Sequence, residues 1–171
     1  QKADLQKQAR LPHEPYLKHF VEDLHEDVPL WAYVDLLTIS DISFLYSISE
    51  QQLKLDIAKN IGILNHGDEL LAKFMHSITI IRNLCAHGSR LYNRLFEQKP
   101  SLNKAEKKLL IVQPNGEVDN SHLYGFIIIM RRLLEPDSFV ALTTEISILT
   151  KKYPFVNLQY YGFRNDWLKT L

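Results

Sequence analysis

The sequence has little of several features that would place it in a specialised class of protein. Its single cysteine, Cys85, cannot form a disulfide within the chain, and no cysteine–histidine cluster has the spacing of a structural zinc site. Its 20 basic and 20 acidic side chains cancel, so bulk positive charge cannot drive binding to a polyanion. No uninterrupted apolar run exceeds five residues, whereas a membrane-spanning helix needs about 20. We therefore expect a cytoplasmic protein without membrane contact, in which any nucleic acid binds to a local patch.

The composition supports one substantial core. A chain of 171 residues with 46% hydrophobic content matches the usual size of a single domain. The first ten residues are polar and charged and lack the apolar stretch of a signal peptide. We expect residues 1–27 to form an N-terminal arm or the remnant of a missing N-terminal segment, and residues 28–171 to form one helical domain.

Apolar residues recur at spacings of three and four along most of the chain, which predicts an all-α fold. The strongest pattern runs from Asp68 to His87 without an internal glycine or proline. Other helices are expected at residues 29–39, after a cap at Ser40 or Asp41, and at residues 49–62, 104–110, 121–134 and 137–152.

Several local signals predict where these helices begin and end. Ser49 and Gln52 have the spacing of a capping box, and Gly88 is expected to end or bend the long helix, after which Ser89 could cap a further turn or two. Residues 111–118, around Pro114-Asn115-Gly116, suggest a loop or small hairpin insertion. The aromatic segment at residues 160–168 is expected to pack against the rest of the chain.

Reactive side chains gather in the segment Arg82-Asn83-Leu84-Cys85-Ala86-His87. On a helix that turns about 100° per residue, Asn83 and His87 lie about 40° apart on one face. The same register would bring Arg90 and Arg94 within about 20° of Asn83, unless Gly88 breaks it. Cys85 lies on the apolar side, and we expect it to be an inert core thiol.

These residue types suit the cleavage of RNA by its own 2′-hydroxyl. The forked guanidinium of Arg82 can reach round the helix and matches a phosphate, while the imidazole of His87 can exchange protons near neutral pH. Transesterification needs deprotonation of the 2′-hydroxyl, stabilisation of an anionic phosphorane and protonation of the departing 5′-oxygen. We therefore expect no metal and no cofactor.

A longer string around this segment resembles a known family. Arg82-Asn83-x3-His87 matches the Arg-x4-His signature of HEPN ribonucleases, and the block from Arg82 to Arg94 resembles the "RN-x-x-AH-x-SRL-aromatic-NR" block of abortive-infection (Abi-like) proteins. Flanking features similar to that family are Pro29-Leu30-Trp31-Ala32 and Tyr161-Gly162-Phe163 with Asn165 and Trp167.

The resemblance implies a HEPN-like helical bundle that forms a homodimer, with two motifs in a shared cleft. It implies a metal-independent endoribonuclease for phage defence or a toxin system, with RNA as substrate. A small RNA or an antitoxin could regulate it, and the sequence leaves open whether either does. His87 would transfer protons, Arg82 would bind the scissile phosphate, and Asn83 would orient the histidine or bind the phosphate. The remaining polar residues of the block would grip flanking RNA or hold the motif helix in place: Arg90, Asn93 and Arg94.

Other interpretations of the same residues stay open. The chain could be a non-catalytic HEPN module that binds RNA or a partner protein, or a purely structural dimerisation domain. His87 could simply favour the negative end of its helix, and Arg90 and Arg94 could form structural salt bridges. Three lysines read first as a solvated helix face and second as a modest phosphate-attracting patch: Lys104, Lys107 and Lys108.

Overall fold

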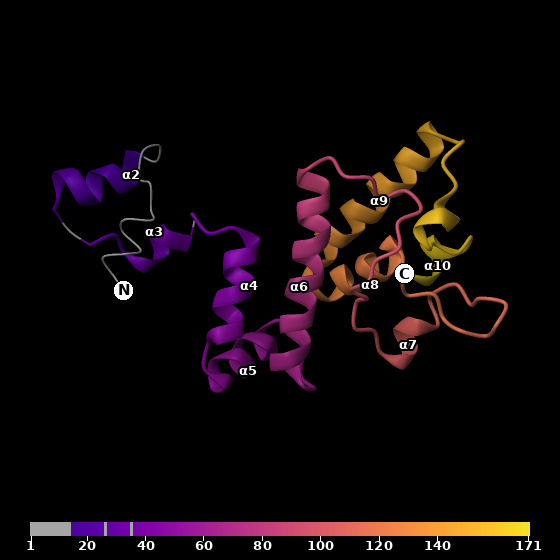
Figure 1. The fold of residues 1–171 in the computed structure, drawn as a ribbon, viewed down its shortest axis with the longest axis horizontal. Coiled ribbons are helices and arrows are strands. Elements are labelled where there is room, and N and C mark those ends of the chain that lie inside the picture. The colour runs from indigo at the N-terminus through magenta and orange to yellow at the C-terminus, as the bar shows by residue number, and fades with distance from the viewer. Residues whose placement is uncertain (1–14, 26, 35) are drawn as a thin grey trace. The chain divides into compact units, whose positions relative to one another are not determined.

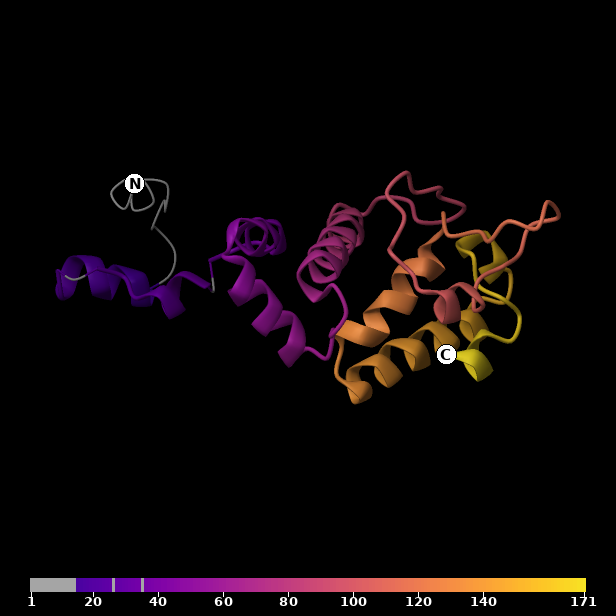
Figure 2. The same ribbon diagram turned by 90° about the horizontal axis from the view of Figure 1, so that it is seen from below.

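The computed structural model describes residues 15–25, 27–34 and 36–171, and in these residues every regular element is a helix (Figures 1 and 2). The β-structure found there is an isolated bridge between Val112 and Val118, with Gly116 at a φ of +82° in the loop between them. The all-α prediction and the small hairpin-like insertion are therefore confirmed, while a HEPN-like arrangement stays a prediction. None of the described helices combines the length and apolar content needed to cross a bilayer.

The chain divides into two compact units, residues 1–41 and 42–171. The described part of the first unit contains α2 (Pro15–Lys18), the π-helix η1 (His19–Asp23) and α3 (Leu30–Val34), around a small core of Leu17, Val28 and Ala32. The helix predicted at residues 29–39 is thus shorter than expected. Residues 1–14 lie outside the described residues, so the predicted N-terminal arm over 1–27 and the domain over 28–171 stay predictions.

The second unit is built around one buried helix. Its elements are α4 (Ile39–Ile48), which begins before the boundary, α5 (Gln51–Asn60), α6 (Gly67–Ala86), α7 (Lys104–Lys107), α8 (Leu123–Leu133), α9 (Pro136–Lys152), the 3₁₀ helix η2 (Leu158–Tyr161) and α10 (Trp167–Thr170). Helix α8 contacts both α6 and α9 (Figure 1), and every residue from 124 to 129 is buried. A helical stretch that is apolar on all sides belongs inside a bundle, which explains the position of residues 124–129, while Arg131 in the last turn of α8 is exposed.

The C-terminal aromatic segment packs into this core, as predicted. Phe163 is 2% exposed, and its ring centroid lies 4.4 Å from that of Tyr124 in α8 and 5.0 Å from that of Trp167 in α10. Burying large aromatic rings contributes several kcal/mol of stability. The segment therefore closes the bundle over α8.

Two of the predicted helix boundaries differ from the structure. The hydroxyl of Ser49 donates to the carbonyl of Leu45 at 2.7 Å, in the last turn of α4, so the predicted capping box at Ser49 is wrong. Helix α4 is capped by Thr38 instead of Ser40 or Asp41: the Thr38 hydroxyl accepts from the Asp41 amide at 3.2 Å, and the Asp41 carboxylate accepts from the Thr38 amide at 2.9 Å. The Ser49 hydroxyl bonds back to the preceding helix, and Glu50, the N-cap residue of α5, makes no side-chain capping bond. At α4 the Thr38 hydroxyl takes the cap that sequence assigned to Ser40 or Asp41.

Candidate active site at the end of helix α6

The predicted motif lies at the C-terminal end of α6. Arg82 and Asn83 are in its last turns, and His87 follows as the capping residue, with its amide donating to the Asn83 carbonyl at 3.0 Å. Gly88 then turns the chain with a φ of +60°, and the Ser89 amide donates back to the Leu84 carbonyl at 2.8 Å. This is a Schellman ending, which favours glycine at the left-handed position. The helix predicted at residues 68–87 and its end at Gly88 are confirmed.

The side chains of the motif are accessible to solvent. Arg82 and His87 are exposed, and Asn83 is half-buried. The guanidinium of Arg82 donates to the side-chain oxygen of Asn83 at 3.2 Å, which brings these two groups together. Within the part of the chain that the structure describes, the imidazole of His87 makes no hydrogen bond and no ion pair, so both of its nitrogens are available to a ligand.

The chain after Gly88 does not continue as a helix. Residues 89–103 contain no helical turn, so the predicted turn capped by Ser89 is wrong. Asn93 adopts a φ of +49°, a left-handed conformation that asparagine tolerates, and its amide donates to the Tyr160 carbonyl at 3.2 Å. The ring of Tyr92 packs against Tyr160 and Tyr161, at centroid distances of 5.2 and 5.7 Å. These tertiary contacts, which local sequence does not reveal, hold the segment in an irregular course.

Because Gly88 breaks the helical register, Arg90 and Arg94 do not extend the stripe of Asn83 and His87. Arg94 donates to the backbone carbonyl of Arg90 at 3.4 Å, and its guanidinium carbon lies 5.8 Å from the centre of the Phe96 ring. Arg90 is exposed. In this chain Arg94 thus makes contacts that can support the loop, and the Arg90 side chain faces solvent.

Cys85 is exposed, so the prediction of a core thiol is wrong. It lies on the same side of α6 as the buried Phe74 and Ile81, but it belongs to the last turn, beyond the part of the helix that other elements cover. Helical periodicity gives the direction of a side chain and not how far along the helix the covering layer extends.

Two of the hollows in the second unit are large enough to hold a small molecule, and Arg82, Asn83 and His87 line neither of these two. One is basic, and the other, of about 280 Å³, is apolar and lies between α8, α9 and the C-terminal segment. Arg82 and His87 are exposed, so the motif of a single chain lies at the surface.

A polar cluster at the start of α8 was not predicted, since His122 had no recognisable partner in the sequence. The His122 Nδ1 lies 3.1 Å from the Asp119 carboxylate, which also accepts from the amide of Ser121 at 3.0 Å and from its hydroxyl at 2.5 Å. Burial raises the pKa of Asp119, but the Ser121 hydrogen bonds and the charge of His122 outweigh it and hold that pKa below its ordinary value. The local pattern Asp-x-Ser is typical of an Asx turn and could have indicated this turn from the sequence.

Together these features describe an all-α protein with an accessible arginine–asparagine–histidine motif at a helix end. A family model described as Abi-like protein matches residues 1–93, which is more than half of the 171 residues, and the chain belongs to this family. The matched region ends at Asn93 and so includes the motif, whereas the C-terminal aromatic segment lies outside it. Comparison with curated proteins and with solved structures finds no match. Family membership suggests a role in an abortive-infection system.

Proposed function

We propose that this protein is a metal-independent endoribonuclease of an abortive-infection or toxin-type system, with Arg82, Asn83 and His87 as its catalytic residues. The proposal depends on the arrangement of these three side chains. The Arg82 guanidinium donates a hydrogen bond to the side-chain oxygen of Asn83 at 3.2 Å. The imidazole of His87 is exposed and forms no hydrogen bond or ion pair with the described residues. A hydrogen-bond donor for phosphate and a proton carrier are thus available at one end of the same helix.

The chemistry needs only these groups and the substrate. The RNA 2′-oxygen attacks the adjacent phosphorus and gives its proton to a neutral imidazole, the phosphorus–O5′ bond breaks, and O5′ takes a proton from a protonated imidazole. The products are a 2′,3′-cyclic phosphate and a 5′-hydroxyl. The Arg82 guanidinium offers forked donors to the phosphorane oxygens, where negative charge develops.

One His87 cannot accept and donate a proton in the same step, so the proposal includes a second copy of the chain. Two motifs facing each other would supply one neutral and one protonated imidazole, and they would turn an open surface into a cleft. Light scattering during size-exclusion chromatography tests this part. We expect a dimer at the concentrations where RNA is cut.

The direct test is cleavage of labelled RNA in EDTA by the wild-type chain and by His87→Ala and Arg82→Ala. We expect each substitution to lower the rate by at least 100-fold, in keeping with the loss of a general acid–base or of an oxyanion donor. The matched controls are His76→Ala, an exposed histidine on the same helix, and Arg131→Ala, an exposed arginine of α8. Neither control should change the rate.

Three outcomes would contradict the proposal. Cleavage that survives in His87→Ala would remove the proposed proton carrier. RNA binding by the wild-type chain without any cleavage would favour a non-catalytic RNA-binding module. Loss of folding in His87→Ala, seen as loss of helical circular dichroism, would make the histidine a structural residue.

A further inference from the structure

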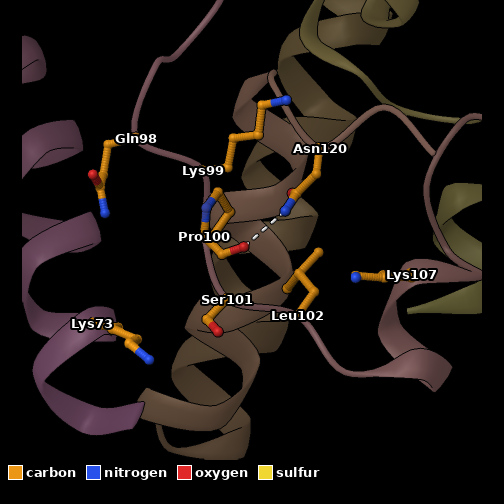
Figure 3. Close-up of a pocket in the computed structure, with 8 residues that line it drawn as sticks. All are labelled: Lys73, Gln98, Lys99, Pro100, Ser101, Leu102, Lys107 and Asn120. Atoms are coloured by element: carbon orange, nitrogen blue, oxygen red, sulfur yellow. Dashed lines mark hydrogen bonds between the residues drawn. The ribbon is translucent and has the colours of Figure 1, made fainter. Parts of the chain in front are cut away.

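The second unit has a basic hollow of about 370 Å³ that belongs to no part of the motif (Figure 3). It opens between α6, α7 and the segment that joins them. The residues that line it are Lys73, Gln98, Lys99, Pro100, Ser101, Leu102, Lys107 and Asn120.

Three lysines and no carboxylate line this hollow, in a chain whose basic and acidic residues are equal in number. Figure 3 shows that they come from three separate elements: Lys73 from α6, Lys107 from α7 and Lys99 from the connecting segment. Within the described residues Lys99 and Lys107 form no ion pair, and Lys73 lies 3.7 Å from Glu69 in a pair that is exposed on both sides. An exposed pair of this kind contributes little, so an anion can compete for Lys73.

Two acidic residues that neighbour the lining in sequence are already bound elsewhere. The Glu106 carboxylate, next to Lys107, accepts from Arg132 at 2.6 Å and from the Asn103 amide at 2.8 Å. The Asp119 carboxylate, next to Asn120, is held by Ser121 and His122. The positive charge of the hollow is therefore not cancelled by these two neighbours.

The wall of the hollow is fixed, and its chemistry suits phosphate rather than a base. The side-chain amide of Asn120 donates to the Pro100 carbonyl at 2.7 Å, which ties the connecting segment to the start of α8 (Figure 3). Ser101 and Gln98 add neutral hydrogen-bond donors. Pro100 and Leu102 are the apolar lining residues, and no aromatic ring is present on which a base could stack.

Lys73 and His87 lie on the same side of α6, whereas Arg82, nine residues after Lys73, starts about 180° round the helix. Fourteen residues separate Lys73 from His87, which corresponds to about 21 Å along the helix axis and about 40° around it. Successive phosphates of one strand advance about 3.4 Å along the axis of a stacked helix and further in an extended strand, so about six nucleotides or fewer cover this distance. One RNA strand running along this side of α6 can thus reach the hollow and His87, and the long Arg82 side chain can approach it from round the helix.

From this arrangement we infer that the lysine hollow binds backbone phosphates of the RNA strand within about six nucleotides of the bond that the motif cleaves. The inference rests on the proposed function, because it names a second contact of the same substrate. It gives the chain a minimum substrate length, since a shorter strand reaches the motif alone.

The test measures binding of an uncleavable 2′-O-methyl RNA 15-mer by fluorescence anisotropy between 50 and 200 mM salt. Each lost lysine–phosphate contact lowers the slope of log K against log salt by about 0.7 for a single strand. Lys99→Gln/Lys107→Gln should therefore lower the magnitude of the slope by about 1.4, and a trinucleotide of the same chemistry should show no difference between variants. The matched control, Lys59→Gln/Lys151→Gln, removes the same charge from exposed sites outside the hollow and should leave the slope unchanged.

An equal slope in the hollow variant and the control variant, or no binding of the 15-mer by the wild-type chain, would overturn the inference. It would also fail if ATP bound to the hollow as tightly as the 15-mer does, since a nucleotide would then be the occupant. Because the RNA cannot be cut, this test is independent of cleavage. A changed slope in a chain that cuts no RNA would support the hollow and refute the nuclease.

Discussion

Replacing Gly88 with alanine should destabilise the chain and slow RNA cleavage, because this glycine ends α6 next to His87. Gly88 has a φ of +60°, and a Cβ atom added there would meet nothing within 4 Å. The cost is therefore backbone strain alone, without steric overlap with neighbouring residues.

The magnitude follows from two opposing effects. The left-handed conformation costs an alanine about 1–2 kcal/mol, while the stiffer unfolded chain returns about 0.4–1 kcal/mol. The free energy of unfolding should fall by about 1 kcal/mol, which corresponds to a Tm lower by about 2–4 °C for a chain of this size. Gly88→Asn should recover most of the loss, because asparagine tolerates this conformation.

Urea unfolding and the cleavage assay check this prediction together. Gly62→Ala is the matched control, since Gly62 ends α5 with a φ of +83° and also has nothing within 4 Å of the added Cβ. Both alanine variants should lose similar stability, but only Gly88→Ala should cut RNA more slowly. Unchanged stability in Gly88→Ala, or an equal loss of cleavage in both variants, would refute the reasoning.

Two further predictions concern the packing and charge around α8. Gly125→Ala should lower the free energy of unfolding, measured in urea, by about 1–3 kcal/mol, although alanine has the higher helix propensity. The new Cβ would overlap the Asn120 side-chain oxygen and lie 2.9 Å from the Pro100 ring. A gain in stability would contradict this packing. Asp119→Asn should cost about 1 kcal/mol at pH 7. The folded state lowers the pKa of Asp119 below 3.8, so the stability difference between wild type and Asp119→Asn should be complete above about pH 4. It should vanish as the pH falls through the pKa that Asp119 has in the folded state. A stability difference that stays constant with pH in urea titrations would count against the ion pair with His122.

The helices of the fold could be predicted where the sequence pattern is regular. Helices α6, α8 and α9 follow from uninterrupted apolar periodicity, and Gly62 and Gly88 end their helices as glycines commonly do. The course of residues 89–103 could not be predicted. It depends on the contact of Tyr92 and Asn93 with the C-terminal segment, almost 70 residues further along the chain.

The candidate site was predicted only where its residues are local. Arg82, Asn83 and His87 stand within one helical turn and a half, so spacing alone puts them together. Lys73, Lys99 and Lys107 come from three elements and share no sequence pattern, and only the tertiary structure shows that they line one hollow. The exposure of a side chain could not be predicted from periodicity either. Cys85 has the spacing of a core residue, but it lies beyond the covered part of its helix and is exposed.

The chemical form of the cleaved RNA end tests the central claim most directly. Mass spectrometry of the 5′ fragment produced in EDTA should show a 2′,3′-cyclic phosphate with the wild-type chain and with His76→Ala, and no such fragment with His87→Ala. A 3′-hydroxyl end, or the same cyclic product from His87→Ala, would contradict transesterification by the motif at the end of α6.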